Sequence, residues 1–384
     1  MNRYQVPYTG LPQQVASLKS ELVARFEQVL DSGRYILGPQ LAAFEEQFAH
    51  LCGTAFAVGV GNGTCALQMV WEALGLGPGD EVITAPNSFV ATASSIAMTG
   101  ARPVFVDIGP DLNLDPERIA AAITPRTRGI VPVHLTGRPA QMPEILRIAE
   151  KHGLFVLEDA AQAVGARRDE RPVGSWGNAA GFSLHPLKNL FAYGDGGVIT
   201  TSDRSLRDKL RQIRNHGLSS RECCEFWSGN NRMDEMQAAL VLVHLGALDE
   251  WTARRRALAH RYHELLSAEV LVPKEAPGEY SVYQTYVIQA GSRDDLQTHL
   301  QEQGVEALIH YRTPMHLQPA AAGLGYAPGD FPMAERAAGR ILSLPLFPSM
   351  SHAQQDRVAD LIHDFYQQRP QVRAEGPAIC ESSV

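Results

Sequence analysis

Lys188 is the residue of this sequence whose surroundings most favour chemistry. It lies between an apolar run, residues 179–182, and a glycine-rich turn, residues 194–197. Most lysines occupy solvated faces, but one held between a buried strand and a tight turn can be a desolvated amine. Such an amine forms a Schiff base with an aldehyde cofactor. The alternative is an ordinary surface lysine. Other residues of the sequence are needed to distinguish these two interpretations.

Asp159 ends a second apolar run, residues 155–157, and two alanines follow it. A carboxylate in these surroundings is poorly solvated and needs a partner to remain ionised. The protonated pyridine nitrogen of pyridoxal phosphate is such a partner. The alternatives are an ion pair with an arginine or an N-cap for the next helix. We expect Gln162, three residues on, to lie over the same pocket.

Residues 61–64, with the sequence Gly-Asn-Gly-Thr, follow a predicted strand and open a predicted helix. Glycines let the backbone approach an anion, and a helix N-terminus offers free N–H groups and a favourable dipole. With the hydroxyl of Thr64, this predicts a phosphate cradle, against the alternative of a plain turn. Residues 59–63 also resemble a dinucleotide fingerprint, but their glycine spacing differs from G-x-G-x-x-G, which disfavours nicotinamide binding.

Phe89 follows another predicted strand, where an aromatic ring either stacks on a flat cofactor or belongs to the core. Together these residues fit one ligand. Pyridoxal phosphate needs a lysine for its aldehyde, an acid for its ring nitrogen, donors for its phosphate and a partner for its ring.

The elements that must position these residues alternate between strands and helices. Strands are predicted at residues 55–60, 81–84, 102–107, 129–135, 154–158, 181–185 and 197–201. Helices are predicted at residues 64–73, 91–99 and 140–151, and a further helix begins at Pro116 with Asp115 as its N-cap. This alternation predicts an α/β fold with a mostly parallel sheet between helices. Ligands bind at the carboxyl ends of such strands, where the residues above fall.

The pattern changes after Asp203. A long helical pattern covers residues 233–266, with an interruption near residues 249–251. Strands at residues 283–289 and 307–310 and helices at residues 293–303 and 353–367 follow. We expect a large domain over residues 1–250, including an N-terminal segment, and a smaller α+β domain over residues 251–384.

Composition excludes several classes of protein. The chain has 34 basic and 42 acidic side chains and a net charge of -8, which argues against nucleic-acid binding. The N-terminus lacks the apolar stretch of a secretory signal, and no segment reaches the length of a membrane span. The five cysteines form no C-x-x-C pair and no metal-type cluster with histidine. This pattern predicts a cytoplasmic protein with reduced thiols and no metal site.

Seven segments together resemble a known family. They are residues 62–64, 77–83, 103–108, 158–162, 186–190, 193–197 and 232–239. In this order, over residues 34–348, they resemble the DegT and StrS group of sugar aminotransferases. The resemblance implies the fold-type I architecture of pyridoxal phosphate enzymes, with a seven-stranded type of sheet.

The resemblance also implies roles. Lys188 would hold the cofactor as a Schiff base, Asp159 would pair with the pyridine nitrogen, and Gln162 and Phe89 would flank the ring. The residues implied to hold the phosphate are Gly63, Thr64, Ser183 and, from a neighbouring subunit, Asn230, with Asn231 as a rival. Residues matched near the site without a fixed role are His134, His185, His310, Tyr311 and His316. A site shared in this way implies at least a homodimer.

The implied reaction is a two-stage transamination. Glutamate or glutamine would donate the amino group, and a keto-sugar, most often linked to a nucleotide, would accept it. Keto-sugar phosphates and keto-cyclitols are the alternative acceptors. A related sugar dehydratase would carry histidine in place of Lys188, and a regulatory protein without catalysis is the remaining alternative.

Overall fold

The computed structural model describes residues 4–369 and contains a seven-stranded central sheet. The strands are β1 (Phe56–Val60), β2 (Glu81–Thr84), β3 (Arg102–Phe105), β4 (Thr127–Val131), β5 (Phe155–Asp159), β8 (Ala179–Ser183) and β9 (Gly197–Thr201). They lie in the order β1-β9-β8-β5-β4-β2-β3. Only β9 pairs antiparallel within this sheet, with both β1 and β8. The predicted α/β fold with a mostly parallel sheet is confirmed.

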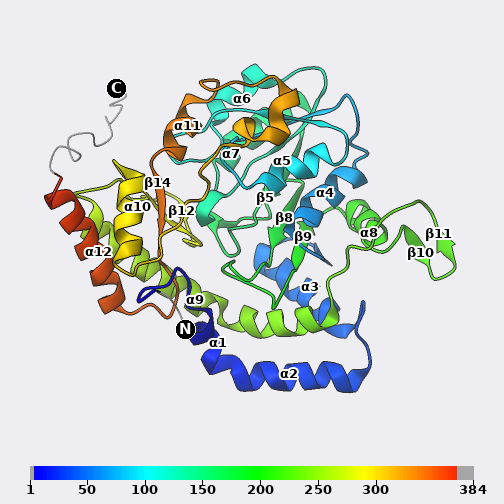
Figure 1. Cartoon of the computed structure of the whole chain (residues 1–384). Helices are drawn as coiled ribbons and strands as arrows, with labels where there is room; N and C mark the ends of the chain where they lie inside the picture. The colour runs from blue at the N-terminus through cyan, green and yellow to red at the C-terminus, as the bar shows by residue number, and fades with distance from the viewer. Residues whose placement is uncertain (1–3, 370–384) are drawn as a thin grey trace.

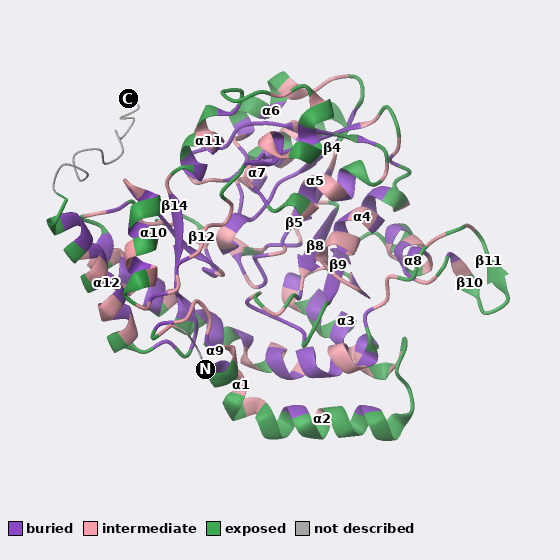
Figure 2. Ribbon diagram, in the orientation of Figure 1, coloured by how far each residue is buried: buried purple, intermediate pink, exposed green. Residues whose placement is uncertain are grey.

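Helices cover both faces of this sheet because its strands are apolar on both sides. One face carries α4 (Gly63–Ala73), α5 (Val90–Ala97) and α8 (Arg204–Ile213). The other carries α3 (Pro39–Cys52), α6 (Pro116–Ala122), α7 (Met142–His152) and the first half of α9 (Glu235–Leu266). Successive strand residues alternate between the two cores: Val156 packs towards α7, whereas Leu157 packs towards α4. Figure 2 shows the buried strands between partly exposed helices.

The second part of the chain forms a smaller α+β unit. Its antiparallel pair is β13 (Tyr286–Gln289) with β14 (Ile341–Leu344), and its helices are α10 (Arg293–Glu302), α11 (Pro332–Ala338) and α12 (His352–Gln367). The predicted strand at residues 307–310 is wrong, because only Leu308 makes a bridge there, to Ser343 in β14. The sequence pattern did not reveal β14, since a short and fully buried run lacks alternation.

The long helix α9 is continuous, so the predicted interruption near residues 249–251 is wrong. Its first half contacts α3 and α2 (Lys19–Ser32), and its second half packs in the core of the smaller unit. The face of α9 that is buried therefore changes along the helix. This change interrupts the apolar periodicity of the sequence, and the interruption led to the prediction of a break in the helix. We propose that the chain passes from the large to the small domain within α9.

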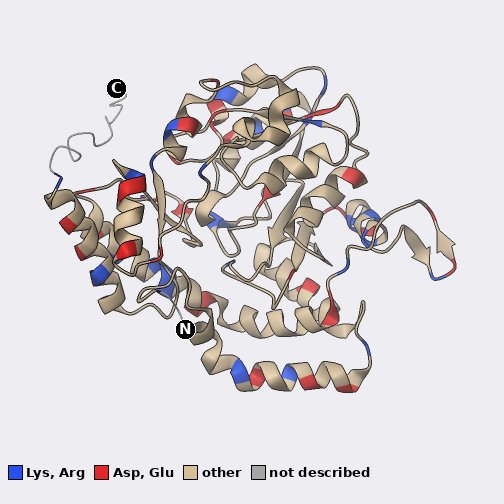
Figure 3. Cartoon of the chain, in the orientation of Figure 1, with Lys and Arg blue, Asp and Glu red and all other residues tan. Residues whose placement is uncertain are grey.

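The remaining short elements lie at the edges of the two units. They are α1 (Leu11–Val15), the strands β6 (Arg167–Arg168), β7 (Arg171–Pro172) and β12 (Glu279–Tyr280), and a protruding hairpin of β10 (Leu218–Ser220) and β11 (Cys223–Cys224). The N-terminal segment crosses to the small unit, where Val6 bridges Val305. Acidic and basic side chains are mixed along the outer helices (Figure 3). Within residues 4–369, every helix is too short or too polar to span a membrane.

Candidate active site

Lys188 lies in the loop that follows β8, at the carboxyl edge of the sheet. Its backbone N–H donates to the carbonyl of His185 (2.8 Å), which closes the turn. Its amine makes neither a hydrogen bond nor an ion pair with any residue between 4 and 369. Burial lowers the pKa of this amine, and the charge of Asp159 opposes that shift in part. Lys188 is therefore a partly buried amine whose neutral, nucleophilic form is favoured.

Asp159 ends β5, the strand next to β8, and is almost completely buried. Its Oδ2 accepts a hydrogen bond from Thr92 Oγ1 (2.6 Å) and its Oδ1 accepts one from the N–H of Ala161 (3.2 Å). Burial raises the pKa of this carboxyl, while these two hydrogen bonds and the charge of Lys188 lower it in part. The carboxylate thus has two neutral donors and no ion-pair partner within residues 4–369.

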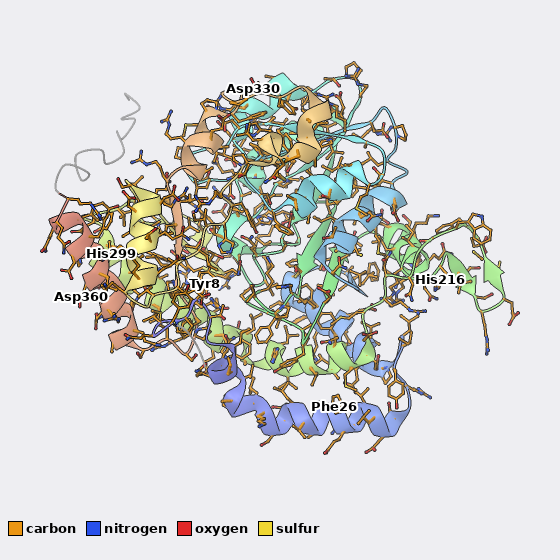
Figure 4. All side chains as sticks on the ribbon, viewed as in Figure 1. Tyr8, Phe26, His216, His299, Asp330 and Asp360 are labelled. Carbon is orange, nitrogen blue, oxygen red and sulfur yellow. The ribbon has the colours of Figure 1, made fainter. Side chains whose placement is uncertain are left out.

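Two small-domain residues complete the surroundings of Lys188. Burial lowers the pKa of His310 to about 4, and the charge of Lys188 adds to this shift. Burial raises the pKa of the Tyr311 hydroxyl, and the charge of Asp159 raises it further. His310 therefore lies within electrostatic range of Lys188, and Tyr311 within electrostatic range of Asp159. His310 is held by Ser343, with 2.9 Å between Nδ1 and Oγ, and its ring lies 5.6 Å from that of Tyr8, labelled in Figure 4.

Gln162 connects the two domains across the same space. Its Oε1 accepts from the backbone N–H of Thr136 (2.6 Å), and its Nε2 donates to the hydroxyl of Tyr311 (3.3 Å). The ring of Phe89 lies 5.5 Å from that of Tyr311 and remains half exposed. An amide and an aromatic side chain are therefore both within reach of a flat ligand next to Lys188.

The residues of the predicted phosphate cradle lie where α4 begins. Asn62 caps the helix, with its Oδ1 accepting from the N–H of Cys65 (2.9 Å). A Cβ added to Gly63 would lie 2.8 Å from Cβ of Ser183 at the end of β8. Only glycine permits this approach, which brings the serine hydroxyl next to the free N–H groups of the first helical turn. Thr64, the second residue of the helix, is partly exposed there.

Asn230 and Asn231 have different surroundings. The Asn231 carbonyl accepts from the N–H of Gly61 (2.9 Å), and its Oδ1 lies 3.4 Å from Sγ of Cys65. Asn230 is exposed, and its side chain makes no hydrogen bond with residues 4–369. Asn231 is thus held within its own chain beside Gly61 and Cys65, whereas the side chain of Asn230 is exposed.

Known proteins resemble this chain over almost its whole length. The DegT/DnrJ/EryC1/StrS aminotransferase family matches residues 16–363. A pleiotropic regulatory protein of Geobacillus stearothermophilus is 46% identical over 94% of this chain and 98% of its own length. The dTDP-3-amino-3,4,6-trideoxy-alpha-D-glucose transaminase of Streptomyces venezuelae is 42% identical over 94% and 96%. The chain belongs to the DegT/DnrJ/EryC1/StrS aminotransferase family.

A solved structure agrees with this assignment. The crystal structure of S. venezuelae DesV in complex with a ketimine intermediate matches with a TM-score of 0.92 at 42% identity, covering 94% of this chain and 98% of that chain. As a member of the DegT/DnrJ/EryC1/StrS family, the protein is a pyridoxal phosphate-dependent aminotransferase. The nicotinamide reading of residues 59–63 is therefore wrong, and these residues instead lead from β1 into α4.

The residues at the carboxyl edge fit the cofactor of this aminotransferase family. Lys188 would hold its aldehyde carbon and Asp159 its ring nitrogen, and the close approach of Gly63 to Ser183 leaves the N-terminus of α4 open for its phosphate. The unpaired amine and the buried carboxylate without an ion pair are both unfavourable without a ligand, and pyridoxal phosphate satisfies both.

Three histidines that the resemblance suggested make their side-chain hydrogen bonds away from the amine of Lys188. The His134 ring is fully buried on the opposite face of β5, where Nε2 donates to Glu158 (2.9 Å) and Nδ1 accepts from the N–H of Ala140 (3.0 Å). His316 packs on α11, with Nε2 3.1 Å from Glu335. His185 is exposed, and its Nδ1 accepts from the backbone of its own turn. A substrate role for these three stays a prediction without support from their contacts.

Arg312, which follows Tyr311 in the sequence, forms an exposed ion pair with Asp294 (2.7 Å).

Sequence reasoning missed Thr92 and Thr136, which hold Asp159 and Gln162 in place. Thr92 lies in the same segment as Phe89, at the start of a helix that follows a strand. A hydroxyl at this position could have been predicted to point into the site. Thr136 acts through its backbone N–H, for which the side-chain sequence gives no signal.

Proposed function

We propose that this protein transfers an amino group from glutamate or glutamine to a keto-sugar, and that the sugar is linked to a nucleotide. The observation that carries the proposal is the unpaired amine of Lys188 beside the buried Asp159, in a space also reached by Gln162 and Tyr311. The printed name of the S. venezuelae relative supports the class of acceptor. We expect the enzyme to act in the cytoplasm.

Bound pyridoxal phosphate supplies an aldehyde that combines with amines and a ring that accepts electrons from the reacting carbon. Lys188 Nζ, whose pKa is lowered by burial, is the base that would remove the proton from the α-carbon of the donor. The same atom later returns a proton to the carbon of the sugar that gains nitrogen. Asp159 keeps a proton on the ring nitrogen by ionic pairing. Gln162 and Tyr311 restrict the ring and exclude water from one side.

The test supplies the purified enzyme with glutamate labelled in its amino nitrogen and with a panel of acceptors. The panel holds nucleotide-linked keto-sugars, keto-sugar phosphates and a keto-cyclitol, and products are identified by mass. We expect a labelled amino sugar from a nucleotide-linked acceptor, and none with the Lys188→Ala variant. A deoxy product without label would instead establish a dehydratase. No conversion of glutamate, and none of glutamine offered in the same way, would favour the regulatory alternative, in line with the name of the G. stearothermophilus relative.

We further propose that the enzyme is a homodimer in which Asn230 completes the phosphate site of its partner. Asn230 is exposed and lacks a hydrogen-bond partner among the described residues, and the neighbouring Trp227 is 96% exposed. The exposed tryptophan beside the hairpin supports the proposal that another protein chain packs there. Asn231 is less suited, because it already contacts Cys65 of its own chain.

Mixed dimers test this arrangement. A Lys188→Ala subunit lacks the amine in its own site but would supply Asn230 to the site of its partner. An Asn230→Ala subunit keeps the amine in its own site but supplies no asparagine to the site of its partner. If the site is shared, subunits exchanged between the two inactive variants should recover activity, because one site of each mixed dimer is complete. No recovery on mixing would refute the shared site. Asn231→Ala, the matched control, should not be complemented by Lys188→Ala, because its defect lies within the same chain.

A further inference from the structure

A short chain of buried hydroxyl groups stands behind Asp159. Thr92 Oγ1 lies 2.6 Å from Asp159 Oδ2, and Ser88 Oγ lies 2.9 Å from Thr92 Oγ1. The exposed fractions are 4% for Asp159, 0% for Thr92 and 5% for Ser88, so water cannot replace these contacts. The carboxylate is therefore held from behind by groups that belong to neither of the segments carrying Lys188 and Gln162.

The donor and acceptor of each of these two hydrogen bonds follow from the number of protons available. A hydroxyl has one proton to donate, and an ionised carboxylate can only accept. Thr92 must therefore donate to Asp159, and Ser88 must then donate to Thr92. Both hydrogen bonds point their positive ends towards the carboxylate, and each polarises the next. Such a chain stabilises the ionised form of Asp159 against the cost of its burial, and Thr92 accordingly lowers the pKa of this carboxyl.

The geometry of the carboxylate is fixed by the same arrangement. Its other oxygen, Oδ1, accepts from the N–H of Ala161, so each oxygen has one donor on the protein side. Thr92 itself lies in the first turn of α5, and its carbonyl accepts from the hydroxyl of Ser95 (2.8 Å). Two donors on fixed backbone elements prevent rotation of the carboxylate and direct its free lone pairs into the site.

We propose that Thr92 is a positioning residue for Asp159, and that Ser88 orients the Thr92 hydroxyl for this task. The proposal deepens the function proposed above and rests on it in one respect, namely that Asp159 pairs with the ring nitrogen of the cofactor. Thr92 acts through Asp159, and the hydroxyl, rather than the size of the side chain, is what the enzyme requires.

The test uses the holoenzyme and the variants Thr92→Val, Thr92→Ser and Ser88→Ala. Valine matches the shape of threonine without the hydroxyl, and serine keeps the hydroxyl without the methyl group. Thr84→Val is the matched control, because Thr84 is also fully buried and donates one hydrogen bond, to the carbonyl of Val131 (2.9 Å), away from Asp159. Two properties are measured: the pH titration of the visible absorbance of the bound cofactor, and the rate and KM of its single-turnover reaction with glutamate.

For Thr92→Val we expect a rate about 10-fold to 100-fold lower, as for loss of a hydrogen bond to a charged group, with KM for glutamate changed by less than about twofold. The absorbance titration should move to higher pH, because a weaker positive charge at the ring nitrogen leaves the Lys188 nitrogen more basic. Thr92→Ser should restore both properties most of the way, Ser88→Ala should show the same changes to a smaller degree, and Thr84→Val should leave both unchanged.

Equal impairment of Thr92→Val and Thr92→Ser would overturn the proposal, because it would show that packing alone matters. An unshifted titration in Thr92→Val would overturn it as well. If Thr92→Val does not fold, Ser88→Ala carries the same test, and a wild-type titration in that variant counts against the proposal. All of these measurements need only the cofactor and glutamate, so they remain decisive even if no keto-sugar proves to be a substrate.

Discussion

Replacing Asp159 by asparagine should stabilise the cofactor-free protein while disabling the enzyme. Asp159 is 4% exposed and forms no ion pair with the residues that the structure describes, and burial raises its pKa above that of an unfolded chain. Asparagine keeps the shape and can retain one hydrogen bond to Thr92 and one to Ala161. The desolvation of a charge is thereby removed while most of the hydrogen bonding stays.

The magnitude follows from these contacts. Replacing a buried charged group by a neutral one of similar volume stabilises proteins by about 1 to 4 kcal/mol, and weaker hydrogen bonds to the neutral group reduce this to about 1 to 3 kcal/mol. An unfolding entropy of roughly 2.1 cal/mol/K per residue gives roughly 0.8 kcal/mol/K for a chain of 384 residues. The expected rise in the unfolding temperature is therefore about 1 to 4 °C.

The pH dependence gives the sign of the effect. Because the folded pKa of Asp159 is raised, the folded state binds more protons than the unfolded state above the unfolded pKa of about 3.9. The wild-type cofactor-free protein thus loses stability from this group as pH rises through that window, and the variant does not. The stability difference should be near zero at about pH 4 and should grow towards neutral pH.

Differential scanning fluorimetry of the cofactor-free proteins across this range measures the difference, and turnover of the holoenzymes measures the cost. We expect the variant to lose about 10²-fold to 10³-fold in kcat, because the ring nitrogen loses its charged partner. A cofactor-free variant that is less stable than the wild type at neutral pH would refute the assignment of Asp159 as a carboxylate lacking a partner until the cofactor binds.

Three further changes have definite expected outcomes. Gly63→Ala should weaken pyridoxal phosphate binding about 10-fold or more in a fluorescence titration, because its Cβ would lie 2.8 Å from Ser183, whereas Gly77→Ala, with only one atom within 4 Å, should not. His310 has a folded pKa of about 4, so it destabilises the fold as pH falls from about 6.5 to about 4, and replacing it by glutamine should flatten thermal stability over this range. Glu158→Gln should lower the free energy of unfolding by about 2 to 4 kcal/mol in a denaturant titration. The reason is that the buried carboxylate accepts hydrogen bonds from three backbone N–H groups and one imidazole N–H. A decrease below about 1 kcal/mol would contradict this assignment of the hydrogen bonds.

The strands of the central sheet were predictable because their residues are apolar and their ends are marked by glycine, proline or polar residues. Asp115 was recognised as an N-cap, and it does accept from the N–H of Glu117. Elements whose structure depends on contacts with distant segments were harder to predict from the sequence. Helix α2 shows this well: Leu22 packs against α9, but Phe26, one turn further along the helix (labelled in Figure 4), is 43% exposed, so the apolar periodicity of α2 is weak.

The candidate site was predictable where one residue type has one strong chemical preference. Lys188 and Asp159 were such cases, because a lysine or a carboxylate in an apolar segment requires an explanation. Contacts between distant segments were not predictable in the same way. Thr92 and Asp159 lie 67 residues apart, and their hydrogen bond exists only because α5 begins opposite the end of β5. The burial of the His134 ring also depends on Glu158 and Ala140, which only the fold brings to it.

Reductive trapping of the cofactor tests the assignment of Lys188 most directly. The chain has five lysines, Lys19, Lys151, Lys188, Lys209 and Lys274. Reduction of the holoenzyme with borohydride followed by peptide mass mapping locates the pyridoxyl group. We expect one group per chain, on Lys188, and loss of this adduct in Lys188→Ala. A full adduct on another lysine of the wild-type enzyme would contradict the site described above.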